Sequence, residues 1–342
     1  MDYFGRDVSR KRTEPSLYYK KLYDTWLVVG WASSILDEPV AVQLLEQRLV
    51  VWRDADGQVH GAYDQCPHRG TQLSLGTVDD SGCITCPYHG WAFATDGQCV
   101  SIPQMAIDTA IPKRVHLDMV GCVEKYGMIW VCLGHPIDEI PEFSVYKDSD
   151  MRHVECAPYT WNCSPERMVE NFMDFGHLGY LHDGLLGSRD DLEVPAHKVI
   201  TNGNQMTCEL TMSVPSTNDS FGVTRLQGDR GKQTNSYIVS APYTIYLESR
   251  YHDSGSARFL YFSVQPLSME KCIGYCYQSR DFDLDAPDEP FAEFQLVLAE
   301  QDRPIVESQF PIEAPLVLTD EVHLPFDKVA ISYRRLLKDY FS

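Results

Sequence analysis

The chain has 342 residues, enough for two domains, and 44% of them are hydrophobic, which predicts a substantial core. With 29 Lys and Arg against 49 Asp and Glu, its formal charge of −20 disfavours nucleic acid and anionic membranes as partners. No apolar segment is long enough to span a bilayer and no secretory signal stands out, so we expect a cytoplasmic protein. The 11 cysteines, an odd number, favour metal binding over a disulfide framework.

The first part of the chain reads as a basic, solvated N-terminal arm, residues 1–24, followed by short strands up to about residue 150. Two apolar runs, Leu49–Trp52 and Val59–Tyr63, flank the dipeptide Asp56-Gly57. An Asp-Gly turn between such runs is typical of a β-hairpin. We therefore expect residues 25–150 to form a small all-β domain with long loops at its tip.

The pattern changes in residues 151–342, which we expect to form an α+β domain. Ser164-Pro165-Glu166 indicates a helix start, with Ser as N-cap, Pro at the first helical position and an acid in the first turn. We expect this helix to continue through Phe175. Residues 196–280 are again strand-like, and residues 290–309 predict a second long helix. Such a mixture is typical of a broad antiparallel sheet that carries helices.

Two short motifs, Cys66-Pro67-His68 and Cys86-Pro87-Tyr88-His89, each offer one thiolate and one imidazole. A structural zinc site also takes two Cys and two His, but zinc ribbons and fingers usually open with two Cys. Unlike pairs suit a [2Fe–2S] centre with two Cys on one iron and two His on the other. Cys83 makes a C-x2-C pair with Cys86 that could bind zinc or form a redox disulfide. We interpret Cys83 as a structural thiol.

A second group of candidate ligands follows the first predicted helix. On a regular helix Glu170, Asp174 and His177 would share one face, and His182 would point elsewhere. Both histidines can reach one metal only if the helix distorts or ends between them, where glycines permit it. Two His and a carboxylate with open positions bind the non-haem Fe(II) of oxygenases. The alternative is two unrelated histidines on a partly buried helix.

Both motifs, together with Tyr126-Gly127-Met128-Ile129-Trp130-Val131, resemble those of the oxygenase component of Rieske non-haem iron oxygenases. The resemblance runs from Trp26 to about Leu337 and is strongest to the short-chain vanillate O-demethylase and dicamba monooxygenase group. It implies an all-β Rieske domain at residues 25–150 and an α+β catalytic domain at residues 151–342. The large antiparallel sheet with helices would be helix-grip-like.

The resemblance also implies two cofactors in each chain, a [2Fe–2S] cluster and a mononuclear Fe(II). For the iron it implies His177 and His182 as ligands, and Asp174 as a carboxylate that carries electrons in from the neighbouring subunit's cluster. The third ligand would come from the late helix, where we choose Asp302 and keep Glu300 as the fallback. The implied cluster ligands are Cys66, His68, Cys86 and His89.

The implied function is that of a terminal monooxygenase or demethylase. It would use O₂ and electrons from a separate NAD(P)H-dependent reductase, directly or through a ferredoxin, to hydroxylate or oxidatively dealkylate a small organic substrate. We expect an aromatic substrate and a homotrimer. The alternatives are a hydroxylase of a specialised natural product, alkaloid or sterol-like, and a non-catalytic Rieske electron-transfer and binding protein. A zinc-stapled interaction module is a third.

The sequence says less about the substrate pocket. We expect its wall to come from strands such as Tyr237–Tyr251 and Ala257–Pro266, whose aromatic side chains suit a flat apolar ligand. Arg225 or Arg250, if either points inward, would favour a carboxylated substrate.

Overall fold

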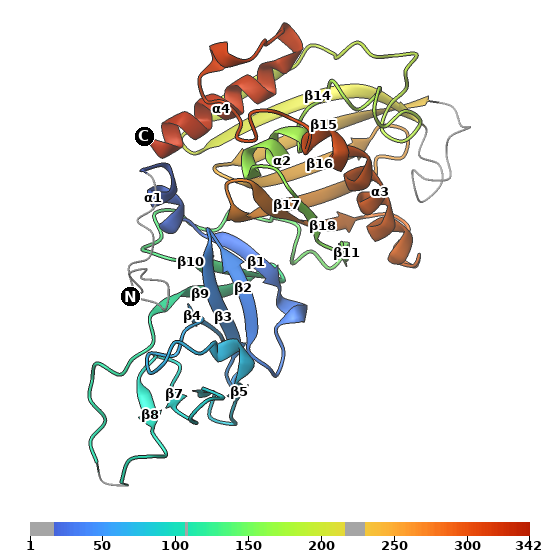
Figure 1. Cartoon of the computed structure of the whole chain (residues 1–342). Helices are drawn as coiled ribbons and strands as arrows, with labels where there is room; N and C mark the ends of the chain where they lie inside the picture. Colours follow the sequence, from blue (N-terminus) through green and yellow to red (C-terminus); the bar gives the residue numbers. More distant parts are fainter. Residues whose placement is uncertain (1–16, 107–108, 216–229) are drawn as a thin grey trace.

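The structure is a computed structural model that describes residues 17–106, 109–215 and 230–342 (Figure 1). Figure 1 shows an N-terminal part, blue to cyan, beside a larger C-terminal part, green to red. The expected arm falls mostly on residues 1–16, outside the described residues. Its last residues form helix α1, Leu17–Tyr23, where Leu22 is fully buried, so this end of the arm is folded.

The N-terminal part is built on a six-stranded antiparallel sheet in the order β1-β10-β9-β4-β3-β2. The predicted hairpin is confirmed: β3 and β4 pair along their length, and Gly57 turns between them at φ +79°. A smaller four-stranded sheet, β5 to β8, lies at the far tip. The strands are β1 Leu27–Trp31, β2 Val40–Leu44, β3 Gln47–Arg53, β4 Val59–Tyr63, β5 Thr77–Val78, β6 Ile84–Thr85, β7 Ala92–Phe93, β8 Cys99–Ser101, β9 Met119–Lys125 and β10 Met128–Cys132.

The C-terminal part is built on one eight-stranded antiparallel sheet. The order is β11-β18-β17-β16-β15-β14-β13, and β12 also pairs with β18. The predicted α+β class with a broad antiparallel sheet is therefore confirmed. The strands are β11 Arg152–Glu155, β12 Tyr159–Trp161, β13 Lys198–Asn202, β14 Gln205–Pro215, β15 Arg230–Ser240, β16 Thr244–Tyr251, β17 Ala257–Ser268 and β18 Lys271–Arg280.

Three helices pack on this sheet: α2 contacts β17 and β18, α3 contacts β18 and β11, and α4 contacts β13 and β14 (Figure 1). In the described residues no helix is both long and apolar enough to cross a membrane. The helices are α2 Pro165–Phe172, α3 Glu289–Val306 and α4 Lys328–Phe341, with short 3₁₀ turns η1 Ala32–Ser34, η2 Leu73–Leu75, η4 Leu318–Asp320 and η5 Pro325–Asp327.

The start of α2 is as predicted, but its end is not. Ser164 is the N-cap and its side chain accepts a hydrogen bond from Arg167 N–H. The helix ends at Phe172, so the expectation that it continues through Phe175 is wrong. Asp174 therefore lies beyond the helix, where its Oδ1 accepts from Gly176 N–H at 2.8 Å. That local bond competes with helical pairing and favours a turn at this point.

The two parts share a core, so the sheets are held firmly against each other. Trp31 of β1 contacts Tyr275 and Tyr277 of β18 edge-to-face, with ring centroids 5.5 Å apart in both pairs. Leu45 N–H also donates to Pro266 O of β17 at 2.8 Å. Aromatic packing and backbone bonds together fix the orientation of the first part on the edge of the large sheet.

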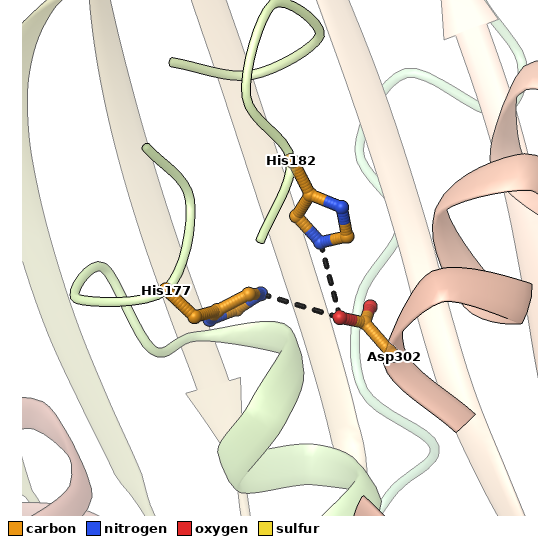
Figure 2. A group of neighbouring side chains, drawn as sticks. All are labelled: His177, His182 and Asp302. Atoms are coloured by element: carbon orange, nitrogen blue, oxygen red, sulfur yellow. Dashed lines mark ion pairs between the residues drawn. The ribbon is translucent and has the colours of Figure 1, made fainter. Parts of the chain in front are cut away.

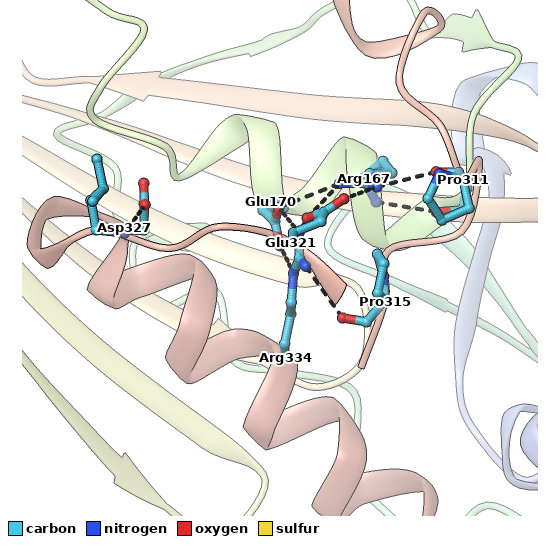
Figure 3. Close-up of polar contacts among 9 residues, drawn as sticks. Arg167, Glu170, Pro311, Pro315, Glu321, Asp327 and Arg334 are labelled. Carbon is cyan, nitrogen blue, oxygen red and sulfur yellow. Dashed lines mark hydrogen bonds and ion pairs between the residues drawn. The ribbon is translucent and has the colours of Figure 1, made fainter. Parts of the chain in front are cut away.

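A buried ion-pair network anchors α2 to α4 (Figure 3). Arg334 is 2% exposed and donates two hydrogen bonds to Glu170 of α2, at 2.6 and 2.7 Å. It also lies 2.7 Å from Glu321, which in turn receives Arg167 at 2.6 Å. Burial by itself raises the pKa of Glu321, but the hydrogen bonds from the two arginines outweigh burial and lower it. The positive charges of the two arginines are thus balanced by the negative charges of the two glutamates.

We predict that Arg334→Met destabilises the protein by about 3 kcal/mol, because two carboxylates lose their buried counter-charge. The loss is expected at neutral pH and shrinks as pH falls through the lowered pKa of Glu321, where the carboxylate becomes protonated. Urea unfolding at several pH values measures it. Arg335→Met is the matched control, since Arg335 is exposed on the next position of the same helix. Equal stability of the two variants would contradict the anchoring role.

Candidate metal centres

The Cys66 and Cys86 loops lie at the tip of the N-terminal part and have the same backbone design. In each, the cysteine N–H donates to the carbonyl five residues on, and the cysteine carbonyl accepts from a glycine N–H four residues on. Gly70 and Gly90 adopt φ +76° and +71°, a conformation that other residues rarely adopt. The bonds are Cys66 N–Thr71 O at 2.8 Å, Gly70 N–Cys66 O at 2.9 Å, Cys86 N–Trp91 O at 2.9 Å and Gly90 N–Cys86 O at 3.0 Å.

These loops bring the four candidate cluster residues together. Both cysteines are 2% exposed, and the rings of His68 and His89 lie 4.6 Å apart. His68 stacks on Trp91 at 4.3 Å, and its Nδ1 is buried without a hydrogen-bond partner. An unpartnered ring nitrogen beside two buried thiols fits a metal cluster. Burial raises the pKa of the Cys66 thiol to about 11, so cluster binding must displace its proton.

The spacing of the four residues suits two metals better than one. Four ligands of a single zinc would lie roughly 4 Å or less from one another. Among the described residues, only one set of three or more potential donors lies within 4.8 Å of one another, and that set is in the C-terminal part. The donors of the two Cys-His loops are therefore spaced more widely than the ligands of one zinc ion. Cys83 belongs to the preceding turn, where its N–H donates to Asp79 Oδ1 at 3.0 Å. The donors therefore fit a dinuclear cluster better than zinc.

That second set consists of His177, His182 and Asp302 (Figure 2). Asp302 Oδ1 lies 3.0 Å from His182 Nε2 and 3.5 Å from His177 Nε2, yet it has no hydrogen bond of acceptable geometry. Ligands at right angles around one ion, at the typical metal–ligand distance of about 2.1 Å, would lie roughly 3 Å apart. The three atoms thus converge as they would on a metal, and two imidazoles with one carboxylate suit Fe(II).

The chain reaches this arrangement through turns, not along a helix. After α2 ends, His177 O accepts from Leu181 N–H at 2.8 Å, and His182 O accepts from Leu185 N–H at 2.9 Å. Gly187 allows the loop to close tightly against Gly179, because a Cβ at Gly187 would lie 2.7 Å from Gly179 Cα. The sequence interpretation that Asp174 and His177 share a helix face is wrong. So is the expected place of the helix end, because α2 ends at Phe172, before both histidines and not between them.

The other acids considered from the sequence lie away from the two histidines. Glu300, the fallback for the third donor, is exposed and pairs with Arg303 at 2.5 Å. Glu170 is held by Arg334 in the buried network. Asp174 lies on the surface side of His177, with 43% of its side chain exposed and Oδ2 3.4 Å from His177 Nδ1.

Gln301 is a residue that the sequence reading did not identify. Its Oε1 accepts from His182 Nδ1 at 2.7 Å, which directs the free Nε2 toward Asp302. His182 is 1% exposed. Burial lowers its pKa, but Asp302 and Gln301 outweigh burial and raise it. A side-chain amide next to an acid on a helix carries no distinctive sequence signal, so only the three-dimensional contact reveals it.

A cavity of about 130 Å³ opens beside the three donors, and His177, His182 and Asp302 form part of its wall. A cavity of roughly 150 Å³ accommodates benzene, so the space suits one aromatic ring. The remaining wall comes from α2, α3 and alternate residues of β14 to β17, among them Phe172, Tyr237 and Leu298. Both segments that the sequence predicts for the wall, Tyr237–Tyr251 and Ala257–Pro266, contribute to it.

The arginine that faces this cavity is not one that the sequence analysis named. Arg225 lies outside the described residues. Arg250 is exposed and pairs with Glu248 at 2.6 Å, so it does not point inward. Arg258, which pairs across the strands with Ser249, lines the cavity instead.

Two family models match the chain: the Rieske [2Fe-2S] domain over residues 25–118 and the vanillate O-demethylase oxygenase C-terminal domain over residues 161–341. Methylxanthine N1-demethylase NdmA of Pseudomonas putida is 35% identical over 303 residues, which cover 88% of this chain and 82% of that protein. Methylxanthine N3-demethylase NdmB of the same species is 30% identical, with 88% and 82% covered.

Solved structures agree with these relatives. NdmA of Pseudomonas putida CBB5 with caffeine superposes with a TM-score of 0.83 at 30% identity, over 94% of this chain and 92% of that one. Dicamba monooxygenase bound to dicamba gives a TM-score of 0.80 at 22% identity, over 94% and 97%, and shows the shared fold.

Proposed function

Because this chain belongs to the Rieske non-haem iron oxygenases, with a C-terminal domain of the vanillate O-demethylase type, we propose that it oxidatively dealkylates a small one-ring aromatic or heteroaromatic substrate. The observation that carries the proposal is the convergence of His177, His182 and Asp302 on the wall of a cavity sized for one ring. Two relatives named as N-demethylases favour removal of an alkyl group over simple hydroxylation.

The enzyme is an oxygenase component, so it works with a separate reductase, and its cofactors are a Rieske cluster and a mononuclear iron. When bound, these two groups supply electron storage and O₂ activation. Cys66, His68, Cys86 and His89 would hold the cluster. His177, His182 and Asp302 would hold the iron, and Gln301 would keep His182 in the tautomer whose Nε2 is free.

Asp174 is the proposed entry point for electrons. Its Oδ2 faces His177 Nδ1 from the surface side, where a second imidazole of another subunit could approach. In Figure 1 the loops around β5 to β8 lie at the far tip of the N-terminal part, away from α2. The neighbouring subunit's cluster loops are the natural donor.

The surface around Asp174 supports a head-to-tail homotrimer. A groove of about 360 Å³ is lined by Asp174 and His177 together with Phe310 and Val322. Phe310 and Val322 are 90% and 88% exposed in the single chain. On the cluster loops, Tyr88 is 63% exposed. Such apolar side chains are typical of surfaces that are covered in an assembly, and head-to-tail contacts close into rings.

The 11 cysteines are all free, which supports a reducing, cytoplasmic compartment. A sterol-like substrate, the alternative considered from sequence, is disfavoured because the cavity suits a single ring.

The experiment that tests the function measures formaldehyde. Holoenzyme with a surrogate reductase, NADH and O₂ should release formaldehyde from N-methyl or O-methyl aromatic compounds, in step with NADH-dependent O₂ uptake. The His177→Ala variant should release none while keeping its cluster absorbance. Ring-hydroxylated products without formaldehyde, across a panel of such substrates, would contradict dealkylation.

We predict that Asp174→Asn slows electron transfer to the iron by orders of magnitude. The amide is nearly isosteric but cannot accept from two imidazole N–H groups as a carboxylate does. With the cluster pre-reduced and substrate bound, stopped-flow absorbance should show much slower reoxidation by O₂ than in the parent. Both metal centres should stay occupied. Asp183→Asn, another partly exposed acid of the same loop, is the control. Reoxidation at the parental rate in Asp174→Asn would overturn its role.

A further inference from the structure

The floor of the cavity carries one polar row across three neighbouring strands. Asn235 of β15 pairs with Ser249 of β16, and Ser249 pairs with Arg258 of β17, so all three side chains lie on the same face of the sheet. All three line the cavity. Ser249 Oγ donates to Asn235 Oδ1 at 2.8 Å, so these two residues satisfy each other. Arg258, at the end of the row, has no such partner among the described residues.

Within the described part of the chain, the Arg258 guanidinium makes no hydrogen bond and no ion pair, and its Nε is buried. The guanidinium lies over the ring of Phe294, 6.0 Å away on α3, and its charge also acts on Tyr237 and Cys276. A partly buried cation without a counter-charge is costly, and the cost falls when an anion binds beside it.

The row continues with more positive charge. Arg258 pairs with Arg280 of β18, which pairs with Arg152 of β11. Asp288 pairs with both of these arginines, at 3.2 Å from Arg280 and 2.8 Å from Arg152. The remaining acids that influence the row, Asp283, Asp285 and Glu289, act on Arg152 and Arg280. Arg258 is therefore the one cation of this row that no acid pairs with among the described residues.

We propose that Arg258 is a specificity-determining residue that binds an anionic group of the substrate, a carboxylate or a sulfonate, at the end of the cavity away from the iron ligands. The inference rests on the proposed dealkylation. Arg presents a planar set of N–H donors that matches a carboxylate in a bidentate manner. Asn235 and Ser249 beside it are neutral, so the guanidinium is the one charged group of the floor in the described part of the chain; Asp302, the other charged lining residue, belongs to the three metal-ligand candidates.

The geometry also indicates which alkyl group is attacked. Arg258 lies near Phe294, and Asp302 follows eight residues later on the same helix, a rise of roughly 12 Å. A hydrogen bond of about 2.9 Å and one ring with a substituent opposite the anion fill a span of this order. The substrate class is therefore an aromatic acid whose N-alkyl or O-alkyl group lies on the side of the ring away from the anion.

The test compares benzoate, benzenesulfonate and the neutral isostere benzamide as probes, by calorimetric titration of the holoenzyme. The wild type should bind at least one anion about tenfold or more tightly than benzamide, as expected for a charge-assisted hydrogen bond. The preference should disappear in Arg258→Gln and persist in Arg258→Lys. Arg250→Gln is the matched control, because Arg250 is an exposed arginine on the adjacent strand. It should behave as the wild type.

Several outcomes would overturn the inference. One is a wild type without preference for an anion, whether both kinds of probe bind or neither does. Another is a preference that survives in Arg258→Gln, as would occur if the carboxylate bound the iron itself. Cluster absorbance and melting temperature establish that each variant is folded, and the wild-type comparison needs no variant.

Turnover separates this inference from the proposed function. 4-Methoxybenzoate should release formaldehyde with a higher kcat/KM than 4-methoxybenzamide, and Arg258→Gln should remove the difference mainly through KM. If anions bind through Arg258 but no formaldehyde forms from any methylated compound, the dealkylation is wrong and the anion site stands. If neutral substrates are demethylated equally well by wild type and Arg258→Gln, with no gain for acids, the function stands and the anion site is wrong.

Discussion

Everything in the C-terminal part depends on holding one carboxylate between two imidazoles. Asp302 comes from α3, and His177 and His182 come from a loop more than a hundred residues earlier, yet their donor atoms lie within 4.8 Å. A set of ligands keeps such a spacing only where rigid elements hold the side chains. The buried arginine–glutamate network anchors α2, the large sheet supports α3, and Gln301 orients His182. The cavity and its specificity follow from where this centre stands.

Some of this architecture could be predicted from the sequence because the signals are local. The two Cys-His loops need closely spaced ligands, and Ser164-Pro165 marks a helix start by its own chemistry. The end of α2 could not be located from the sequence, because apolar residues continue to Phe175. The hydrogen bond that favours a turn here, from Gly176 N–H to Asp174 Oδ1, is seen only in the structure. The choice of Asp302 over Glu300 agrees with the geometry, but adjacent helix acids differ only in the direction in which they point.

The arginine on the cavity floor shows the limit most clearly. In a strand, neighbouring residues point to opposite faces, so a one-residue error exchanges cavity for solvent. Arg250 and Arg258 lie on adjacent strands and look equivalent in sequence, yet Arg250 is exposed and Arg258 lines the cavity. Only the strand register decides between them. The buried network is equally hard to predict, because its pairs between α2 and the last part of the chain are more than 150 residues apart and resemble ordinary surface charges.

The central claim is that the cluster of one subunit serves the iron of its neighbour. Mixed assemblies of two defective chains test it most directly: Cys66→Ser, which is expected to lose the cluster, and Asp302→Ala, which is expected to lose the iron. Each chain alone should form no product. Co-expressed with different tags and purified through both, the mixed assemblies should release formaldehyde with reductase and O₂, because some cluster-bearing subunits adjoin iron-bearing ones. Mixed assemblies that contain cluster sulfide and mononuclear iron, yet form no product, would contradict the account.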